Sequence, residues 1–93
     1  MAVALKIEYP STDVGVYQKA REALGMPTAH DGEGLLFHWV EQTEGGFTVY
    51  DVWESREQFD AFVEQRLAPI AEQVGMPEAE VEETAVYDYM SPA

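Results

Sequence analysis

Apolar side chains recur along the chain with two different periods, and the order of these periods predicts the secondary structure. Four segments with strand-like patterns lie between turn residues: 2–9, 35–43, 47–54 and 80–89. Apolar residues at helical spacing predict one helix between Asp13 and Gly25 and a second between Ser55 and Gly75. Pro69 removes a backbone donor from the second helix, so we expect a kink or a restart there.

The resulting order, βαββαβ, predicts a ferredoxin-like α+β fold in a single domain over residues 1–93. Each βα half requires a right-handed crossover. Two such crossovers bring the first and third strands side by side and put both helices on one face of a four-stranded antiparallel sheet. Both helices are followed by Gly-Met-Pro, at 25–27 and at 75–77, which hints at two similar halves.

The hairpin over residues 35–54 is the most informative segment, because both of its faces are apolar. One face is predicted to carry Leu36, His38, Val40, Val49, Asp51 and Trp53. The other face is predicted to carry Leu35, Phe37, Trp39, Tyr50 and Val52. Two helices cover only one face of such a sheet, so an apolar second face would remain in water. We therefore predict a symmetric homodimer in which the open sheet faces pack together.

His38, Asp51 and Trp53 form the one constellation that suggests chemistry. A turn at 44–45 would place His38 opposite Asp51, and a turn at 45–46 would place it opposite Trp53. Either turn leaves the three side chains on one face, although the pattern does not tell which face that is. A carboxylate beside an imidazole can orient the ring and increase its basicity, as a general base requires. A hydrogen-bonded pair with a purely structural role is the alternative.

The composition narrows the classes of function. Five basic residues against eighteen acidic ones give a net charge of −13, so we expect no nucleic-acid and no membrane partner. The chain has no cysteine, which excludes disulfides, zinc–thiolate sites and thiol nucleophiles. No histidine spacing suits a metal site, and we expect neither a metal nor a cofactor. Residues 1–10 lack the pattern of a signal peptide, so we expect a cytoplasmic protein.

The length, the order of elements, the two apolar hairpin faces and the segment GGFTVYDVWES at 45–55 resemble the dimeric α/β-barrel superfamily. More narrowly, the chain resembles small uncharacterised proteins related to antibiotic-biosynthesis monooxygenases. This resemblance implies a homodimer with a ligand pocket between the sheet and the helices of each subunit. Active relatives include cofactor-independent monooxygenases and haem-degrading enzymes. No active site of these relatives can be carried over residue by residue, because the chain contains no Asn and residues 56–74 contain no His.

Two hypotheses of function follow. In the first, the protein binds or oxidises a small apolar or aromatic molecule without a cofactor, and His38 and Asp51 are the catalytic pair. The ligand-binding walls of the pocket are predicted to be Trp53, Tyr17, Phe59 and Phe62. Haem binding through His38 is a variant of this hypothesis. In the second, the protein is a non-catalytic acidic dimer that serves as an interaction or regulatory module. A sheet–helix cavity of about 300 Å³ or more beside the pair would favour the first.

Overall fold

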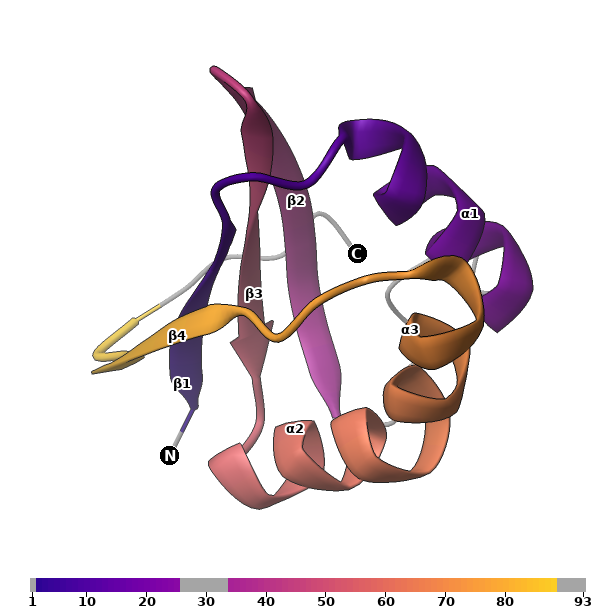
Figure 1. The fold of residues 1–93 in the computed structure, drawn as a ribbon. Helices are drawn as coiled ribbons and strands as arrows, with labels where there is room; N and C mark the ends of the chain where they lie inside the picture. Colours follow the sequence, from indigo (N-terminus) through magenta and orange to yellow (C-terminus); the bar gives the residue numbers. More distant parts are fainter. Residues whose placement is uncertain (1, 26–33, 89–93) are drawn as a thin grey trace.

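The computed structural model describes residues 2–25 and 34–88, which form a sheet with helices on one face (Figure 1). The strands are β1 (Val3–Tyr9), β2 (Leu35–Thr43), β3 (Gly46–Trp53) and β4 (Glu80–Ala85). The helical elements are α1 (Val14–Leu24), α2 (Arg56–Phe62), η2 (Val63–Leu67) and α3 (Ala68–Val74). The strands lie in the order β2-β3-β1-β4, and each neighbouring pair is antiparallel. The predicted ferredoxin-like α+β fold is confirmed.

Local signals explain where the helices begin and end. Asp13 caps α1, because its Oδ1 accepts a hydrogen bond from the N–H of Gly15 at 2.7 Å. Gly25 follows α1 with a φ of 66°, the left-handed conformation that commonly ends helices. At α2, the Ser55 hydroxyl accepts from the N–H of Gln58 at 3.2 Å and donates to Oε1 of the same residue at 3.0 Å. These caps fix the points at which the helices leave the sheet.

The predicted disturbance at Pro69 takes the form of a wider helical turn, η2, between α2 and α3. Pro69 has no N–H to offer to the preceding turn, and its ring crowds the carbonyl four residues earlier. The helix responds with π-type pairing, in which the N–H of Ala68 bonds to the carbonyl of Val63. Figure 1 shows the chain changing direction between α2 and α3 along this segment.

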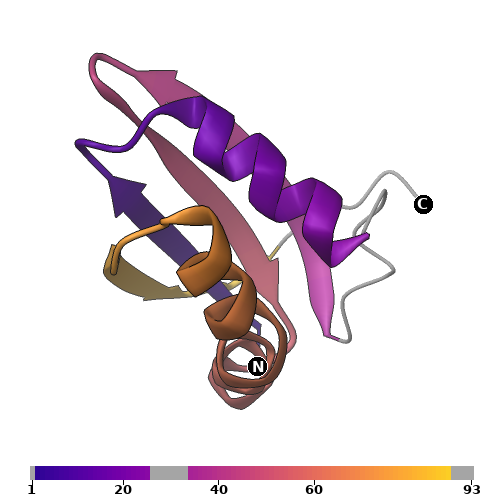
Figure 2. The same cartoon turned by 45° about the vertical axis from the view of Figure 1, so that its right-hand side comes forward.

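The core lies between the sheet and the helices, which cover the same face in both ribbon views (Figures 1 and 2). Alternate residues of the central strands β1 and β3 point into it, and α2 adds one aromatic ring. The buried apolar residues of this cluster are Leu5, Ile7, Tyr9, Phe47, Val49, Trp53 and Phe59. Burial of each large apolar side chain contributes about 1.5–3 kcal/mol to folding. This cluster surrounds the buried polar side chain of Asp51 on β3.

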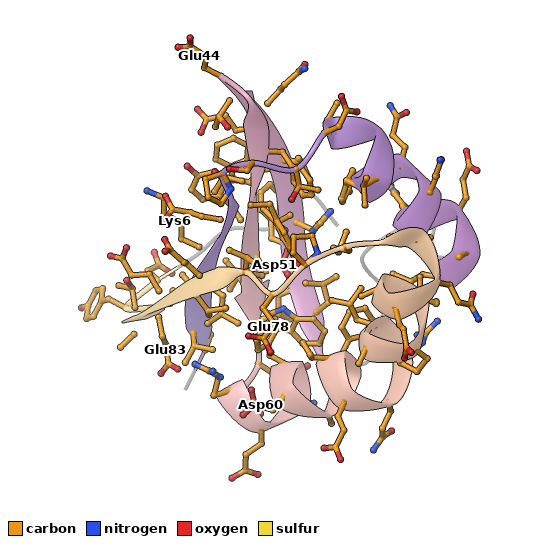
Figure 3. All side chains as sticks on the ribbon, in the orientation of Figure 1. Lys6, Glu44, Asp51, Asp60, Glu78 and Glu83 are labelled. Atoms are coloured by element: carbon orange, nitrogen blue, oxygen red, sulfur yellow. The ribbon has the colours of Figure 1, made fainter. Side chains whose placement is uncertain are left out.

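The hairpin turns at Glu44 and Gly45, where Gly45 has a φ of 83°. Of the two registers considered above, the structure therefore has the one in which His38 and Asp51 lie directly opposite each other. Figure 3 shows the side chain of Asp51 between the sheet and the helical layer, whereas Glu44 lies at the far tip of the hairpin. The face that carries the pair is the one covered by the helices.

One face assignment in this hairpin is wrong. Leu35 was predicted to share the open face with Phe37, but it pairs with Trp53 and packs against the core. The reason is a β-bulge between Leu35 and Phe37, where one extra residue on β2 breaks the simple alternation.

The last strand is shorter than predicted. β4 ends at Ala85, and Tyr87, which lies within the predicted strand range 80–89, is fully exposed. The strand is an edge of the sheet, and all six of its residues are exposed, so burial gives no reason for the pairing to continue. Tyr89, the other tyrosine of the predicted strand, lies outside the residues that the structure describes.

The sheet face opposite the helices carries exposed aromatic side chains. Phe37 is 38% exposed and Trp39 is 47% exposed, and the ring of Trp39 stacks on that of Tyr50 at a centroid distance of 4.1 Å. No helix of residues 2–25 and 34–88 lies over this face (Figure 1). No helix in these ranges is long and apolar enough to cross a membrane.

Candidate functional site

Four side chains form a continuous chain of hydrogen bonds under the helices. Nδ1 of His38 lies 2.6 Å from Oδ1 of Asp51, and Nε2 of the same ring lies 2.7 Å from the hydroxyl of Tyr17. The indole N–H of Trp53 donates to the other carboxylate oxygen of Asp51 at 3.1 Å. The order along the chain of contacts is Tyr17, His38, Asp51, Trp53. The distances of 2.7 Å and 3.1 Å lie within the ordinary range of hydrogen bonds, and the contact between His38 and Asp51 is slightly shorter, in the direction expected for a carboxylate acceptor.

Each member is positioned by a regular element. Asp51 and Trp53 are two residues apart on β3, so both point to the helix-covered face. His38 is the partner of Asp51 on the neighbouring strand β2, which brings the two side chains within direct contact. Tyr17 reaches down from the first turns of α1, and its ring lies nearly parallel to that of His38 at a centroid distance of 6.0 Å. The chain of contacts therefore connects the two layers of the fold.

Asp51 is a carboxylate in the interior, since only 8% of its surface is exposed. A buried carboxylate is costly unless donors satisfy it, and here His38 and Trp53 supply one to each oxygen. A carboxylate can only accept hydrogen bonds, so the contact with His38 requires a proton on Nδ1. In the neutral imidazole, Nε2 then accepts, and the Tyr17 hydroxyl is its donor.

The phenol of Tyr17 is in its protonated form at neutral pH. Burial, the largest effect, raises the pKa of Tyr17, Arg21 lowers it in part, and the charge of Asp51 raises it further. Nη1 of Arg21 donates to the Tyr17 oxygen at 3.4 Å, one helical turn away on α1. The Tyr17 hydroxyl thus donates a hydrogen bond to Nε2 of His38 and accepts one from Arg21.

A pocket of about 450 Å³ lies beside this chain of contacts, between the sheet and the helices. All six residues that the sequence singled out line it: Tyr17, His38, Asp51, Trp53, Phe59 and Phe62. Phe59 and Phe62 stand on α2, with their rings 5.8 Å and 5.3 Å from the ring of Trp53. The structure therefore gathers the predicted residues at one place, and their roles toward a ligand remain predictions.

Sequence reasoning missed two polar residues of the pocket, Tyr9 and Arg21. Only 6% of the surface of Tyr9 is exposed, its ring stacks on that of Phe47 at a centroid distance of 4.7 Å, and within residues 2–25 and 34–88 its hydroxyl makes no hydrogen bond. A signal for both existed. Tyr9 continues the alternation of Leu5 along β1, and Arg21 lies four residues after Tyr17 on the same helix face.

No cluster of three or more potential metal-binding side chains occurs within the described residues, 2–25 and 34–88. The side chains of Tyr17, His38, Asp51 and Trp53 are instead paired with one another. What the arrangement can do chemically is to accept a proton from a molecule in the pocket and to hold the resulting positive charge beside Asp51.

Comparisons with known proteins find similarity at the level of structure. No family model matches the sequence, and no curated protein matches it. The fold is similar to that of Rv0793 from Mycobacterium tuberculosis, with a TM-score of 0.66 and 16% identity over 98% of this chain and 100% of that one.

Two further solved structures carry names that refer to oxygenation. SnoaB, a cofactor-independent oxygenase from Streptomyces nogalater, has a TM-score of 0.65 and 12% identity over 99% of this chain and 98% of that one. A protein named as a candidate antibiotic biosynthesis monooxygenase, from Chloroflexus aurantiacus J-10-fl, has a TM-score of 0.66 and 17% identity over the full length of both chains. The predicted resemblance to this group of ferredoxin-like proteins is confirmed for the fold.

Proposed function

We propose that the protein binds a small apolar, aromatic molecule in the sheet–helix pocket and removes a proton from it, as the first step of a cofactor-independent, monooxygenase-like reaction. The observation that carries this proposal is the buried pair of His38 and Asp51 in the wall of an apolar cavity. An imidazole that is oriented by a carboxylate is a suitable general base. The neighbouring aromatic rings suit a flat ligand.

The size of the pocket supports this function over a purely structural one. A volume of about 450 Å³ lies within the range of about 300–1,000 Å³ that is typical of small-molecule sites. A non-catalytic interaction module needs no such cavity, and a core that served stability alone would be filled. The similarity in fold to a protein named as a cofactor-independent oxygenase adds to this support.

A ligand screen by thermal shift tests the proposal. The probes are 1-naphthol, 2-naphthol and naphthalene, and the variants are His38→Ala and Asp51→Ala. We expect the naphthols to raise the melting temperature of the wild type and to lose this effect in both variants. Gln42→Ala, an exposed change on the same strand as His38, is the matched control and should respond as the wild type does. A wild type that none of the probes stabilises would contradict the proposal.

Haem binding through His38 receives no support from the geometry. Both ring nitrogens already face partners, Asp51 at 2.6 Å and Tyr17 at 2.7 Å. An iron atom would have to displace one of them before it could bind. A hemin titration is therefore expected to leave the Soret band of hemin unshifted, and a shift that His38→Ala abolishes would reverse this conclusion.

We also propose that the protein acts as a homodimer through the open face of its sheet. Phe37 and Trp39 are exposed there, and a groove between them also includes Tyr50 and Val52. Contiguous apolar surface of this kind commonly marks an interface, and the same face on a second copy is its natural complement. Such a dimer would leave the ligand pocket, on the other side of the sheet, within each subunit.

A further inference from the structure

Both ring nitrogens of His38 are engaged within the protein. The N–H at Nδ1 donates a hydrogen bond to Asp51, and Nε2 accepts a hydrogen bond from the hydroxyl of Tyr17. The imidazole therefore has no lone pair left for a proton of the ligand unless one of these contacts breaks. A general base is expected to lie within hydrogen-bonding reach of the proton that it takes. The imidazole of His38, which Asp51 orients, is therefore not available to take a proton from the ligand directly.

The group at the end of the chain of contacts is the phenolic oxygen of Tyr17. Tyr17 lines the pocket, and its oxygen, which donates to His38 and accepts from Nη1 of Arg21 at 3.4 Å, still has a second lone pair. The other end of the chain is closed, because Trp53 donates to Asp51 from a fully buried indole. A proton can thus enter the chain at Tyr17, whereas the Trp53 end is sealed from the pocket by its own hydrogen bond.

Resting on the proposed function, we propose that Tyr17 is the catalytic residue that exchanges a proton with the ligand, and that His38 and Asp51 are positioning residues that make its oxygen basic. In the step, the O–H bond of a ligand hydroxyl breaks and its proton forms a new O–H bond on Tyr17. The original proton of Tyr17 moves to Nε2 of His38. The products are a ligand anion, a neutral tyrosine and an imidazolium ion beside the carboxylate of Asp51.

The geometry favours this relay over direct transfer to His38. The new positive charge on the imidazole arises 2.6 Å from the carboxylate of Asp51, which has only 8% of its surface exposed to water. An ion pair is strong there, because water screens it little. The N–H of Trp53 holds the second carboxylate oxygen, so the first stays aimed at Nδ1. The tyrosine passes its own proton on as it receives another, so it never carries a full negative charge in a pocket that disfavours one.

The protonation state of His38 can be measured directly, because the polypeptide contains only two histidines, His30 and His38. Protein labelled with ¹⁵N-histidine gives NMR signals from two rings, and the His38→Gln variant identifies which belongs to His38. The ring signals report which nitrogen carries a proton and whether both do. In the free wild type, we expect His38 to be neutral with its proton on Nδ1. A proton on Nε2 instead would overturn the proposal, with no ligand involved.

The ligand arm uses 4-nitro-1-naphthol, whose absorbance reports its ionisation, at a pH low enough that the free probe is still neutral. In the wild type, we expect the bound probe to be the anion and His38 to become an imidazolium. In Tyr17→Phe, at a concentration of probe that saturates the variant, the bound probe should remain neutral and His38 should stay neutral. Tyr50→Phe removes a tyrosine hydroxyl from the opposite sheet face, where it donates to Glu41, and is the matched control. Asp51→Asn should raise the pH at which the bound probe ionises, a readout that loss of packing alone would not move.

The outcomes separate this inference from the proposed function. An imidazolium that still forms in Tyr17→Phe would show that His38 takes the proton directly, and would overturn the relay while leaving the function intact. If the imidazolium of His38 no longer forms in Tyr9→Phe but still forms in Tyr17→Phe, the phenol that exchanges the proton is Tyr9. That result would also overturn the relay through Tyr17. A wild type that binds neither this probe nor naphthalene would overturn the proposed function together with the relay.

Discussion

His38 and Asp51 lie opposite each other on β2 and β3, with Nδ1 and Oδ1 separated by 2.6 Å beneath the helices. Neither residue is placed there by a loop. Their contact follows from the pairing of two strands, so its geometry is as rigid as the sheet itself. The carboxylate also accepts from Trp53, which makes the stability of the core depend on a polar group.

The indole of Trp53 should be important for stability through its N–H as well as its area. Trp53→Phe keeps most of the ring packing but leaves one oxygen of Asp51 without a donor and opens a small cavity. We expect the free energy of unfolding to fall by about 2–4 kcal/mol. Urea denaturation followed by circular dichroism measures this change.

Trp39→Phe is the control, because Trp39 is 47% exposed and a phenylalanine ring can stack on Tyr50 in its place. It should cost less than about 1 kcal/mol. Equal losses in the two variants would argue against a special contribution from the hydrogen bond to Asp51.

Stability should decrease at alkaline pH because of Tyr9. Burial, and after it the charge of Asp51, raises the pKa of the Tyr9 phenol above its ordinary value of about 10. Above that pH the unfolded chain loses this proton before the folded chain does. The folded state then holds more protons, so the free energy of unfolding falls as pH rises, by up to about 1.4 kcal/mol per pH unit for one such group.

Melting temperatures of the wild type and of Tyr9→Phe between about pH 8 and pH 11 check the sign of this effect. The variant should show a flatter decline than the wild type over the upper part of this range. Tyr87→Phe changes a fully exposed tyrosine and should follow the wild-type curve. A steeper decline in Tyr9→Phe would be inconsistent with a raised pKa at Tyr9.

Gly46 should be intolerant of a side chain. A Cβ at this position would collide with the backbone carbonyl of Tyr9 and lie 2.8 Å from that of Pro10, neither of which can rotate away. We expect Gly46→Ala to lower the free energy of unfolding by about 1–3 kcal/mol. In Gly15→Ala, the nearest atom is Oδ1 of Asp13, a side-chain atom that can shift more easily than backbone, and alanine favours the helix, so the net change should stay within about 1 kcal/mol. Thermal unfolding of the two variants compares them directly.

The proposed dimer should respond both to charge on the open face and to salt. Phe37→Glu places a carboxylate in the predicted interface and should weaken dimerisation at least about tenfold, which is about 1.4 kcal/mol. Each chain carries a net charge of −13, so added salt should screen the repulsion between subunits and tighten the wild-type dimer. Sedimentation velocity over a dilution series measures both effects.

Gln42→Glu is the control, because it adds the same charge to β2. Gln42 is the partner of Phe47, so its side chain belongs to the face covered by the helices and not to the open face. It should dimerise much as the wild type does. A wild type that remains monomeric at every concentration and salt level would rule out the open face as a dimer interface.

The sequence was sufficient to predict the fold, because each element has its own local signal. Apolar periods, the caps at Asp13 and Ser55 and the break at Pro69 depend only on neighbouring residues. The shared face of His38 and Asp51 was also predictable, since any two-residue turn preserves it.

The failures concern features that depend on non-local packing. The bulge that turns Leu35 inward is a choice between two pairings of similar local pattern, and the end of β4 depends on what covers that edge. The hydrogen bond from Tyr17 to His38 depends on the distance between α1 and β2, which no local pattern encodes. The sequence could place Tyr17 in the wall of the pocket but could not assign its hydroxyl a partner.

The two-residue turn at Glu44 and Gly45 ties loop length to the identity of both sheet faces. An insertion of two residues can lengthen the hairpin and leave Asp51 beside His38. An insertion of one residue must be absorbed as a bulge, or it carries Asp51 and Trp53 to the side where subunits are proposed to meet. The length of this turn therefore decides whether Asp51 faces the pocket. Insertions of an even number of residues preserve that face, and insertions of an odd number do not unless a bulge absorbs them.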